Sequence, residues 1–201
     1  MKAVSALFHP LLMATYCCVI FYFTMPEIFA PVPQQSIPYF ILSVFVLTFV
    51  IPVLSILFLR FTRRLSNLEL SYREERIVPF FFISSLYAVT TYLFYSQIRL
   101  TNSLLTLMVI VSLLVFIIFL VSIWFKISVH SAGIWGTAGV FSAMSLKYIN
   151  ALGIGPLLIL FIIAGITTSS RLYLGRHTPM ESWSGVVLGF TLCFVGFILF
   201  G

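Results

Sequence analysis

The sequence contains no aspartate and little charge of either sign. Its acidity comes from five glutamates, and charged residues make up only 8% of the 201 residues, against roughly 25% in a typical soluble domain. So few charged side chains cannot cover a water-facing surface. A soluble globule, a disordered chain and a nucleic-acid-binding domain are therefore excluded, and the net charge of +6 needs a membrane explanation first.

Cysteine is scarce as well. Cys17, Cys18 and Cys193 lie in apolar runs, without the spacing of a disulfide framework or of metal ligands, and we expect them to be small helix-packing residues. The apolar run after Lys2 is not followed closely by a small-residue cleavage site. We therefore expect this run to be a first membrane span and not a signal peptide.

Long apolar runs dominate the chain, which is 61% hydrophobic and contains 22 phenylalanines. About 20 residues cross a bilayer. Interruptions by charges, prolines and polar clusters predict seven helices, over residues 7–25, 37–59, 77–95, 104–125, 131–146, 152–168 and 183–200. Pro52 is a candidate kink in the second helix. The fifth is short and weakly apolar, with Gly133, Gly136 and Gly139 on a face that allows close helix approach. We predict an all-α polytopic membrane helix bundle with six or seven transmembrane helices.

The cations are distributed unequally between the two faces that seven crossings define. One face carries nine of them: Lys2, Arg60, Arg63, Arg64, Arg73, Arg76, Lys126, Arg171 and Arg176. The other carries Arg99 and Lys147. Because cytoplasmic loops are enriched in Lys and Arg, we expect an integral protein of a bacterial inner (plasma) membrane with the nine-cation face in the cytoplasm. If five of the nine bind an anionic substrate, four against two remain.

Two polar clusters stand beside predicted helices, where charged side chains are costly and typically functional. The first is Lys126–Gly133 and the second is Ser169–Glu181. Two crossings separate the clusters, and two more separate the first from Arg73 and Arg76. All three groups are therefore expected at the same end of the bundle.

These residue types suit phosphate chemistry. Arginine presents a planar fork that matches phosphate oxygens, and a neutral histidine can attack phosphorus while a second protonates the departing oxygen. If Pro179 opens the last helix, Glu181 lies in its first turn, where it can accept the N–H of His177 and hold one tautomer. No metal or other cofactor is expected, because the carboxylates are too few for a magnesium cage.

The second cluster reads Ser-Arg, five residues, His, three residues and an acid. It resembles the third signature of the type 2 phosphatidic acid phosphatase (PAP2) superfamily, which has Asp at the last position. In the first cluster, residues 127–130 keep the Ser and His of the family's second signature, Pro-Ser-Gly-His. The resemblance covers about residues 73–201, as a PAP2-like core. Residues 7–72 then form N-terminal helices and a basic loop of the same single domain.

The resemblance implies a membrane phosphatase that hydrolyses a lipid-linked phosphate monoester or pyrophosphate. By this resemblance His177 is the nucleophile that forms a phosphohistidine, Glu181 is its orienting partner and His130 is the general acid. Arg171 is a phosphate ligand, assisted by Ser128 and nearby backbone amides. The partners implied are a phosphorylated lipid and the bilayer.

The family's first signature, Lys, six residues, Arg-Pro, is degenerate here. Arg76 is its nearest match, with Pro79 three residues on, and Glu69 occupies the Lys position. Arg73 and Lys126 are candidates for the missing cation. Glu181 replaces Asp, and Val129 replaces a glycine of the second signature.

Two alternatives stay open beside an active phosphatase. The chain could be a non-catalytic membrane protein of the same fold: a lipid-headgroup binder, a transporter or a partner subunit. Vanadate-dependent oxidant chemistry, as in haloperoxidases that share the signatures, is disfavoured by the apolar body and the missing Lys. Arg176 fits phosphate or lipid headgroups equally, and His9 is expected to start a helix. The lipid and the oligomeric state are left open.

Overall fold

The computed structural model describes residues 1–62, 73–98, 100–148 and 153–201, and every regular element in these ranges is helical. Within these ranges, six helical stretches are long and apolar enough to cross a membrane: Ala3–Thr24, Gln34–Phe61, Glu74–Ile98, Asn102–Ser122, Ile154–Tyr173 and Pro179–Phe200. The expected all-α polytopic bundle is therefore confirmed. Four residues named above, Arg63, Arg64, Glu69 and Arg99, lie outside the described ranges.

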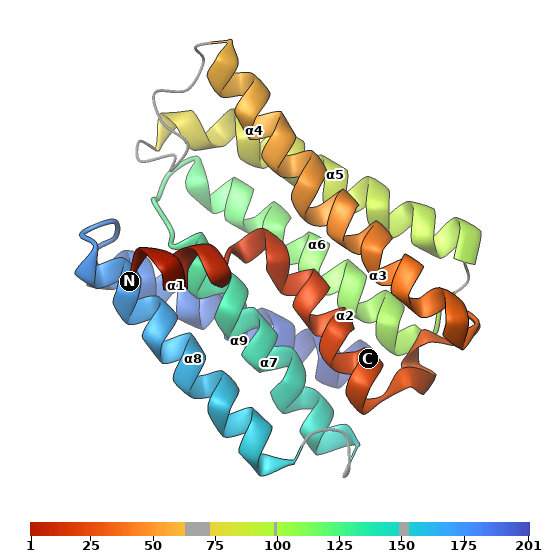
Figure 1. The fold of residues 1–201 in the computed structure, drawn as a ribbon. Coiled ribbons are helices and arrows are strands. Elements are labelled where there is room, and N and C mark those ends of the chain that lie inside the picture. Colours follow the sequence, from red (N-terminus) through yellow and green to blue (C-terminus); the bar gives the residue numbers. More distant parts are fainter. Residues whose placement is uncertain (63–72, 99, 149–152) are drawn as a thin grey trace.

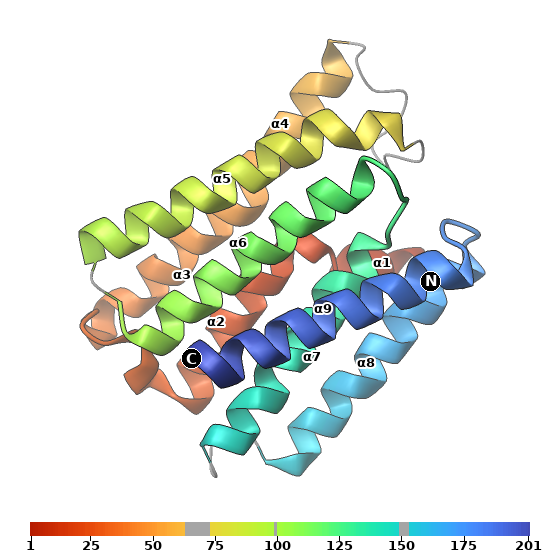
Figure 2. The same cartoon turned by 180° about the vertical axis from the view of Figure 1, so that it is seen from behind.

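The long helices pass back and forth between two ends of the molecule (Figures 1 and 2). In chain order they are α2 (Met13–Thr24), α3 (Ile37–Phe45) continued by α4 (Ile51–Phe61), α5 (Glu74–Ile98), α6 (Asn102–Ser122), α7 (Val129–Lys147), α8 (Ile154–Tyr173) and α9 (Pro179–Phe200). α4 packs on α5, α5 on α6, α6 on α9, and α8 packs on α7 at the opposite edge. The short α1 (Lys2–Leu7) packs against α8 at the end that holds residues 123–128 and 174–178, which we call the site end.

The least apolar of the predicted spans is enclosed by other helices. α7 packs against α2, α6, α8 and α9, and it buries Gly136, Ala138, Gly139 and Phe141 among others. Because protein and not lipid surrounds it, α7 has no need of a uniformly apolar surface. This position explains the weak hydropathy of residues 131–146.

Glycines on both partners bring α7 and α9 close together. A Cβ built on Gly139 would lie 2.6 Å from the carbonyl oxygen of Phe190, and one on Gly189 would overlap the backbone of Ala132. Only a residue without a side chain permits this separation of the two backbones. The close approach expected at Gly139 is thus confirmed, and it holds the first turn of α7 beside the start of α9.

Pro52 disrupts the second span as expected. Proline has no N–H, so the carbonyl of Thr48, four residues earlier, lacks its helical donor. A π-helical turn, Val46–Val50, joins α3 to α4 here. The hydroxyl of Tyr87 on α5 donates to the Thr48 carbonyl at 3.1 Å, which satisfies a polar group that has no water available at this depth.

Several predicted boundaries at the site end need correction. The predicted helix 7–25 is divided at His9 and Pro10, because proline starts the new 3-10 turn Pro10–Leu12 and cannot continue the preceding helix. The predicted helix 152–168 continues to Tyr173, so Ser169, Ser170 and Arg171 are helical and not in a loop. Polar side chains alone do not end a helix whose backbone hydrogen bonds continue.

Candidate active site

α8 ends in a turn that the sequence dictates locally. Gly175 has a φ of +62°, a conformation that favours glycine. Its N–H donates to the carbonyl of Leu172 at 2.9 Å, and the N–H of Arg176 donates to that of Arg171 at 3.1 Å. This pair of bonds is a Schellman motif. It places Arg171 in the last turn of α8 and turns the chain so that His177 follows directly.

α9 begins immediately after His177 with a complete capping box. The Thr178 side chain accepts from the N–H of Glu181, and the Glu181 carboxylate accepts from the N–H of Thr178, each at 3.3 Å. Pro179 takes the first helical position, where its missing N–H costs nothing. Glu181 therefore lies in the first turn of α9, as expected from the sequence.

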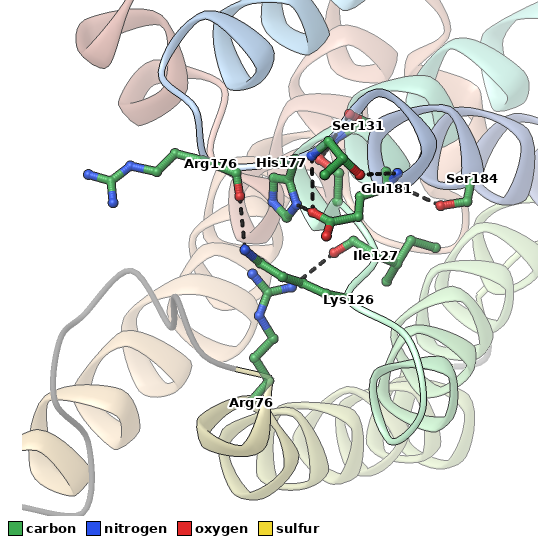
Figure 3. Close-up of polar contacts among 10 residues, drawn as sticks. Arg76, Lys126, Ile127, Ser131, Arg176, His177, Glu181 and Ser184 are labelled. Carbon is green, nitrogen blue, oxygen red and sulfur yellow. Dashed lines mark hydrogen bonds and ion pairs between the residues drawn. The ribbon is translucent and has the colours of Figure 1, made fainter.

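The same Glu181 oxygen that caps α9 also contacts His177. Nδ1 of His177 lies 2.8 Å from Oε2 of Glu181, and the two side chains are 3% and 16% exposed (Figure 3). A carboxylate accepts only, so Nδ1 carries the proton and Nε2 keeps its lone pair. Burial, followed by the nearby cations Arg76 and Arg171, lowers the pKa of His177 to about 4 although its bond to Glu181 acts in the opposite direction. His177 is thus a neutral imidazole at neutral pH.

The first turn of α7 lies beside this pair. The Ser128 side chain caps it by accepting from the N–H of Ser131 at 3.4 Å, and the N–H of Ser128 donates to the Glu181 carbonyl at 3.0 Å. The next two residues, Val129 and His130, belong to the first turn of α7, so their backbone N–H groups have no acceptor within the helix. Such N–H groups favour the binding of an anion.

His130 stands between α1, the His9 turn and Arg171. Its Nε2 donates to the carbonyl of Ser5 at 3.2 Å, and its ring meets that of His9 edge-on, with centroids 5.5 Å apart. Arg171 interacts electrostatically with His9, His130 and His177 alike, and the latter two rings also interact with each other. Two imidazoles that are 47 positions apart in the sequence therefore share one site.

Arg76 joins the group from α5. The residue is 4% exposed, and its Nη1 donates to the carbonyl of Ile127 at 3.0 Å. Nearby, Nζ of Lys126 donates to the carbonyl of Arg176 at 3.1 Å, which ties the α6–α7 connection to the turn after α8 (Figure 3). These bonds link α5, the α6–α7 connection and the turn between α8 and α9 around His177.

A cavity of about 330 Å³ opens between these groups. At its polar end it is lined by Ser5, His9, Arg76, His130, Arg171, Arg176 and His177. In the described part of the chain this wall carries three arginines and no carboxylate, since Glu181 stands behind His177. The balance of charge suits an anion held against neutral imidazoles.

The other predicted phosphate ligands support the site and do not line it. Ser128 is fully buried and caps α7, whereas Lys126 holds the Arg176 carbonyl. Arg73 is half exposed, and its Nη1 donates to the carbonyl of Trp124 at 3.1 Å. Neither Lys126 nor Arg73 is among the residues that line the cavity, so their candidacy for the missing cation of the first signature stays a prediction.

Sequence reasoning undervalued His9. The helix-start role expected for it is confirmed, since its Nδ1 accepts from the N–H of Leu11 at 3.3 Å. The same ring also lines the cavity and touches His130. The available signal was the crossing count, which places His9 on the same face as the two polar clusters.

Comparisons with protein families, curated proteins and solved structures found no match to this chain. The chemistry of the site therefore rests on its own geometry. It offers an imidazole lone pair at His177, a carboxylate that orients it, buried guanidinium groups and a second imidazole. Such a set can bind a phosphate and transfer its phosphoryl group to nitrogen.

Proposed function

We propose that the chain is a PAP2-type membrane phosphatase that hydrolyses a lipid-linked phosphate monoester or pyrophosphate. The observation that carries the proposal is the 2.8 Å contact between Nδ1 of His177 and Oε2 of Glu181, at a cavity that Arg76, Arg171 and His130 also line. The contact keeps the Nε2 lone pair available, and the arginines supply the charge that a phosphate needs. The resemblance of residues 73–201 to the PAP2 signatures supports the same reaction.

In the first step, Nε2 of His177 attacks phosphorus while the bond from phosphorus to the lipid oxygen breaks. Arg171 and Arg76 stabilise the charge that develops on the other phosphate oxygens. His130 donates a proton to the leaving oxygen. Because its Nε2–H points to the Ser5 carbonyl, that proton comes from Nδ1 of the doubly protonated ring, a form that the bound phosphate stabilises.

In the second step, a water molecule attacks the phosphohistidine. His130, now neutral, accepts the water proton, and the nitrogen–phosphorus bond breaks to release inorganic phosphate and restore His177. The Glu181 carboxylate stabilises the positive charge on His177 throughout. Both steps use the same two imidazoles in reversed roles.

Phosphate release from purified protein tests the proposal. A panel of phospholipid monophosphates and polyprenyl pyrophosphates is offered to the wild type and to His177→Ala and Arg171→Ala. We expect each variant to lose activity by roughly 10³-fold or more, because the nucleophile or a ligand of its phosphate is gone. A radiolabelled substrate should leave acid-labile, alkali-stable label on the wild type and none on His177→Ala.

Arg60→Ala is the matched control. Arg60 is an exposed cation in the last turn of α4, outside the cavity wall, and its loss should leave turnover unchanged. Wild-type turnover in His177→Ala would refute the mechanism, and absence of phosphate release from every substrate would refute the proposed function.

A second candidate is a non-catalytic binder of phosphorylated lipid headgroups. It is favoured by the contact of His130 Nε2 with the Ser5 carbonyl, which commits one ring nitrogen of the proposed acid to a structural bond. In that case lipid phosphates bind to the wild type and release no phosphate, and Arg171→Ala weakens binding while His130→Gln leaves it unchanged.

A further inference from the structure

The cavity extends well beyond the residues that handle phosphate. It is lined along α7 from His130 to Val140 and along α5 from Arg76 to Tyr87. At about 1.5 Å per helical residue, these ranges measure about 15 Å and about 16 Å. Two helices thus give the same depth independently. This depth is about half of the roughly 30 Å hydrocarbon core of a bilayer.

The deeper wall presents apolar groups. It is formed by α2, α4, α5, α6, α7 and α9, and it includes Met13, Cys17, Ile83, Val111, Leu114 and Cys193. Its two hydroxyl groups are engaged by backbone carbonyls: Thr137 donates to Gly133 at 3.1 Å, and Tyr87 donates to Thr48 at 3.1 Å. An apolar cavity of this kind receives hydrocarbon more readily than water.

A glycine keeps the passage open at mid-depth. Gly136 lines the cavity, and a Cβ built on it would lie 3.1 Å from both the Cys193 Sγ and a Leu114 methyl carbon. A side chain at this position has no free space except the cavity itself. The small residues of α7 therefore serve the passage as well as the contact with α9.

We propose that this deeper cavity holds one hydrocarbon chain of the substrate, aligned with the helices, and limits its length. The inference rests on the proposed function for the phosphate headgroup. The whole cavity, with its polar end included, measures about 330 Å³, which is at the small end of ligand pockets, roughly 300–1,000 Å³, and this favours a single chain over two. At about 1.25 Å per carbon, from the C–C bond length and angle, a depth of about 15 Å corresponds to about twelve carbons.

The test uses n-alkyl phosphates of increasing length with protein in lipid nanodiscs. For water-soluble chains, we expect kcat/KM to rise about fourfold per methylene and to stop rising near twelve carbons. Val111→Phe and Val115→Phe fill the cavity at two depths, since both residues lie on α6 and Val115 is closer to the site end. Four residues correspond to about 6 Å. The length limit of Val115→Phe should therefore be about five carbons shorter than that of Val111→Phe.

Val109→Phe is the matched control. Val109 lies two residues from Val111 on the same helix, outside the cavity wall, and is 47% exposed. Its length profile should equal that of the wild type. If Val111→Phe does not fold, Val115→Phe carries the comparison with the same control.

Non-hydrolysable n-alkylphosphonates separate this inference from the proposed function. The measurement is the rise in unfolding temperature that each phosphonate causes. If this rise grows with chain length in the wild type and stops growing at a shorter chain in Val115→Phe, the chain site is supported even where no phosphate is released. The opposite outcome is that the dependence of kcat/KM on chain length is the same in Val115→Phe, Val111→Phe and Val109→Phe. That result overturns the chain site, while the phosphate release itself leaves the phosphatase assignment standing.

Discussion

Glu181 performs two tasks with one carboxylate oxygen. Oε2 accepts from the Thr178 backbone at 3.3 Å, which completes the α9 cap, and from Nδ1 of His177 at 2.8 Å. The extra methylene of glutamate, compared with aspartate, is accommodated because the residue sits in the first helical turn, four positions after His177. The orientation of His177 is thereby tied to the start of a helix, which is a rigid reference.

At this scale, burial of His177 predicts a pH-dependent stability. Its pKa is about 4 in the folded protein and about 6.5 when unfolded. Between these values the unfolded chain binds the proton and the folded one does not. The free energy of unfolding therefore falls as pH decreases from 7 to 4, by up to about 3 kcal/mol.

The measurement is the unfolding midpoint of wild type and His177→Gln at pH 7.5 and 4.5. Glutamine does not titrate, so this variant should lose less stability on acidification. Equal losses would contradict the assignment.

At the scale of the elements, the crossing of α7 and α9 positions the proposed catalytic groups. α7 carries His130, and α9 carries Glu181 with His177 just before it. The two helices approach through Gly139, Gly185 and Gly189, which leaves little freedom for one to slide along the other. The separation of the two histidines therefore depends on residues that do not line the cavity.

Gly189→Ala tests this dependence. The added methyl group collides with the backbone of Ala132, and we expect destabilisation of about 1–3 kcal/mol or more with a parallel loss of activity. Gly165→Ala on α8 is the matched control, because a Cβ there meets nothing within 4 Å. It should keep or slightly raise the unfolding temperature. Equal unfolding temperatures and activities for the two variants would show that the crossing has room to relax.

Over the whole molecule, the site lies at the end that is rich in cations. Arg60 lies in the last turn of α4, Arg73 and Arg76 lie at the start of α5, and Arg171 lies in the last turn of α8, all at the site end. Lys126 and Arg176 belong to the two connections that define this end, whereas Lys147 ends α7 at the other. The charge bias favours a cytoplasmic site end. Residue 201 lies at the opposite end (Figure 2).

Cysteine labelling tests this orientation. Cys17, Cys18 and Cys193 are buried, so the native chain should react little with a membrane-impermeant maleimide. Thr62→Cys reports the site end and Glu27→Cys the other, and both positions are exposed. We expect Glu27→Cys to be labelled in intact cells and Thr62→Cys only after lysis. The reverse pattern would place the site on the outer side.

The amino-acid sequence by itself determined the helices and the contacts within a few residues of one another. The pairing of His177 with Glu181 follows from Pro179 and a spacing of four, because helix geometry is local and regular. Tertiary structure alone decided which distant groups join them: Arg76 arrives from α5, and His9 and Ser5 arrive from the N-terminal turn. It also decided that Lys126 and Arg73 lie outside the cavity wall, and that apolar residues of several helices line a cavity below the proposed phosphate site. Such contacts depend on how whole helices pack, and no local spacing in a single sequence records that packing.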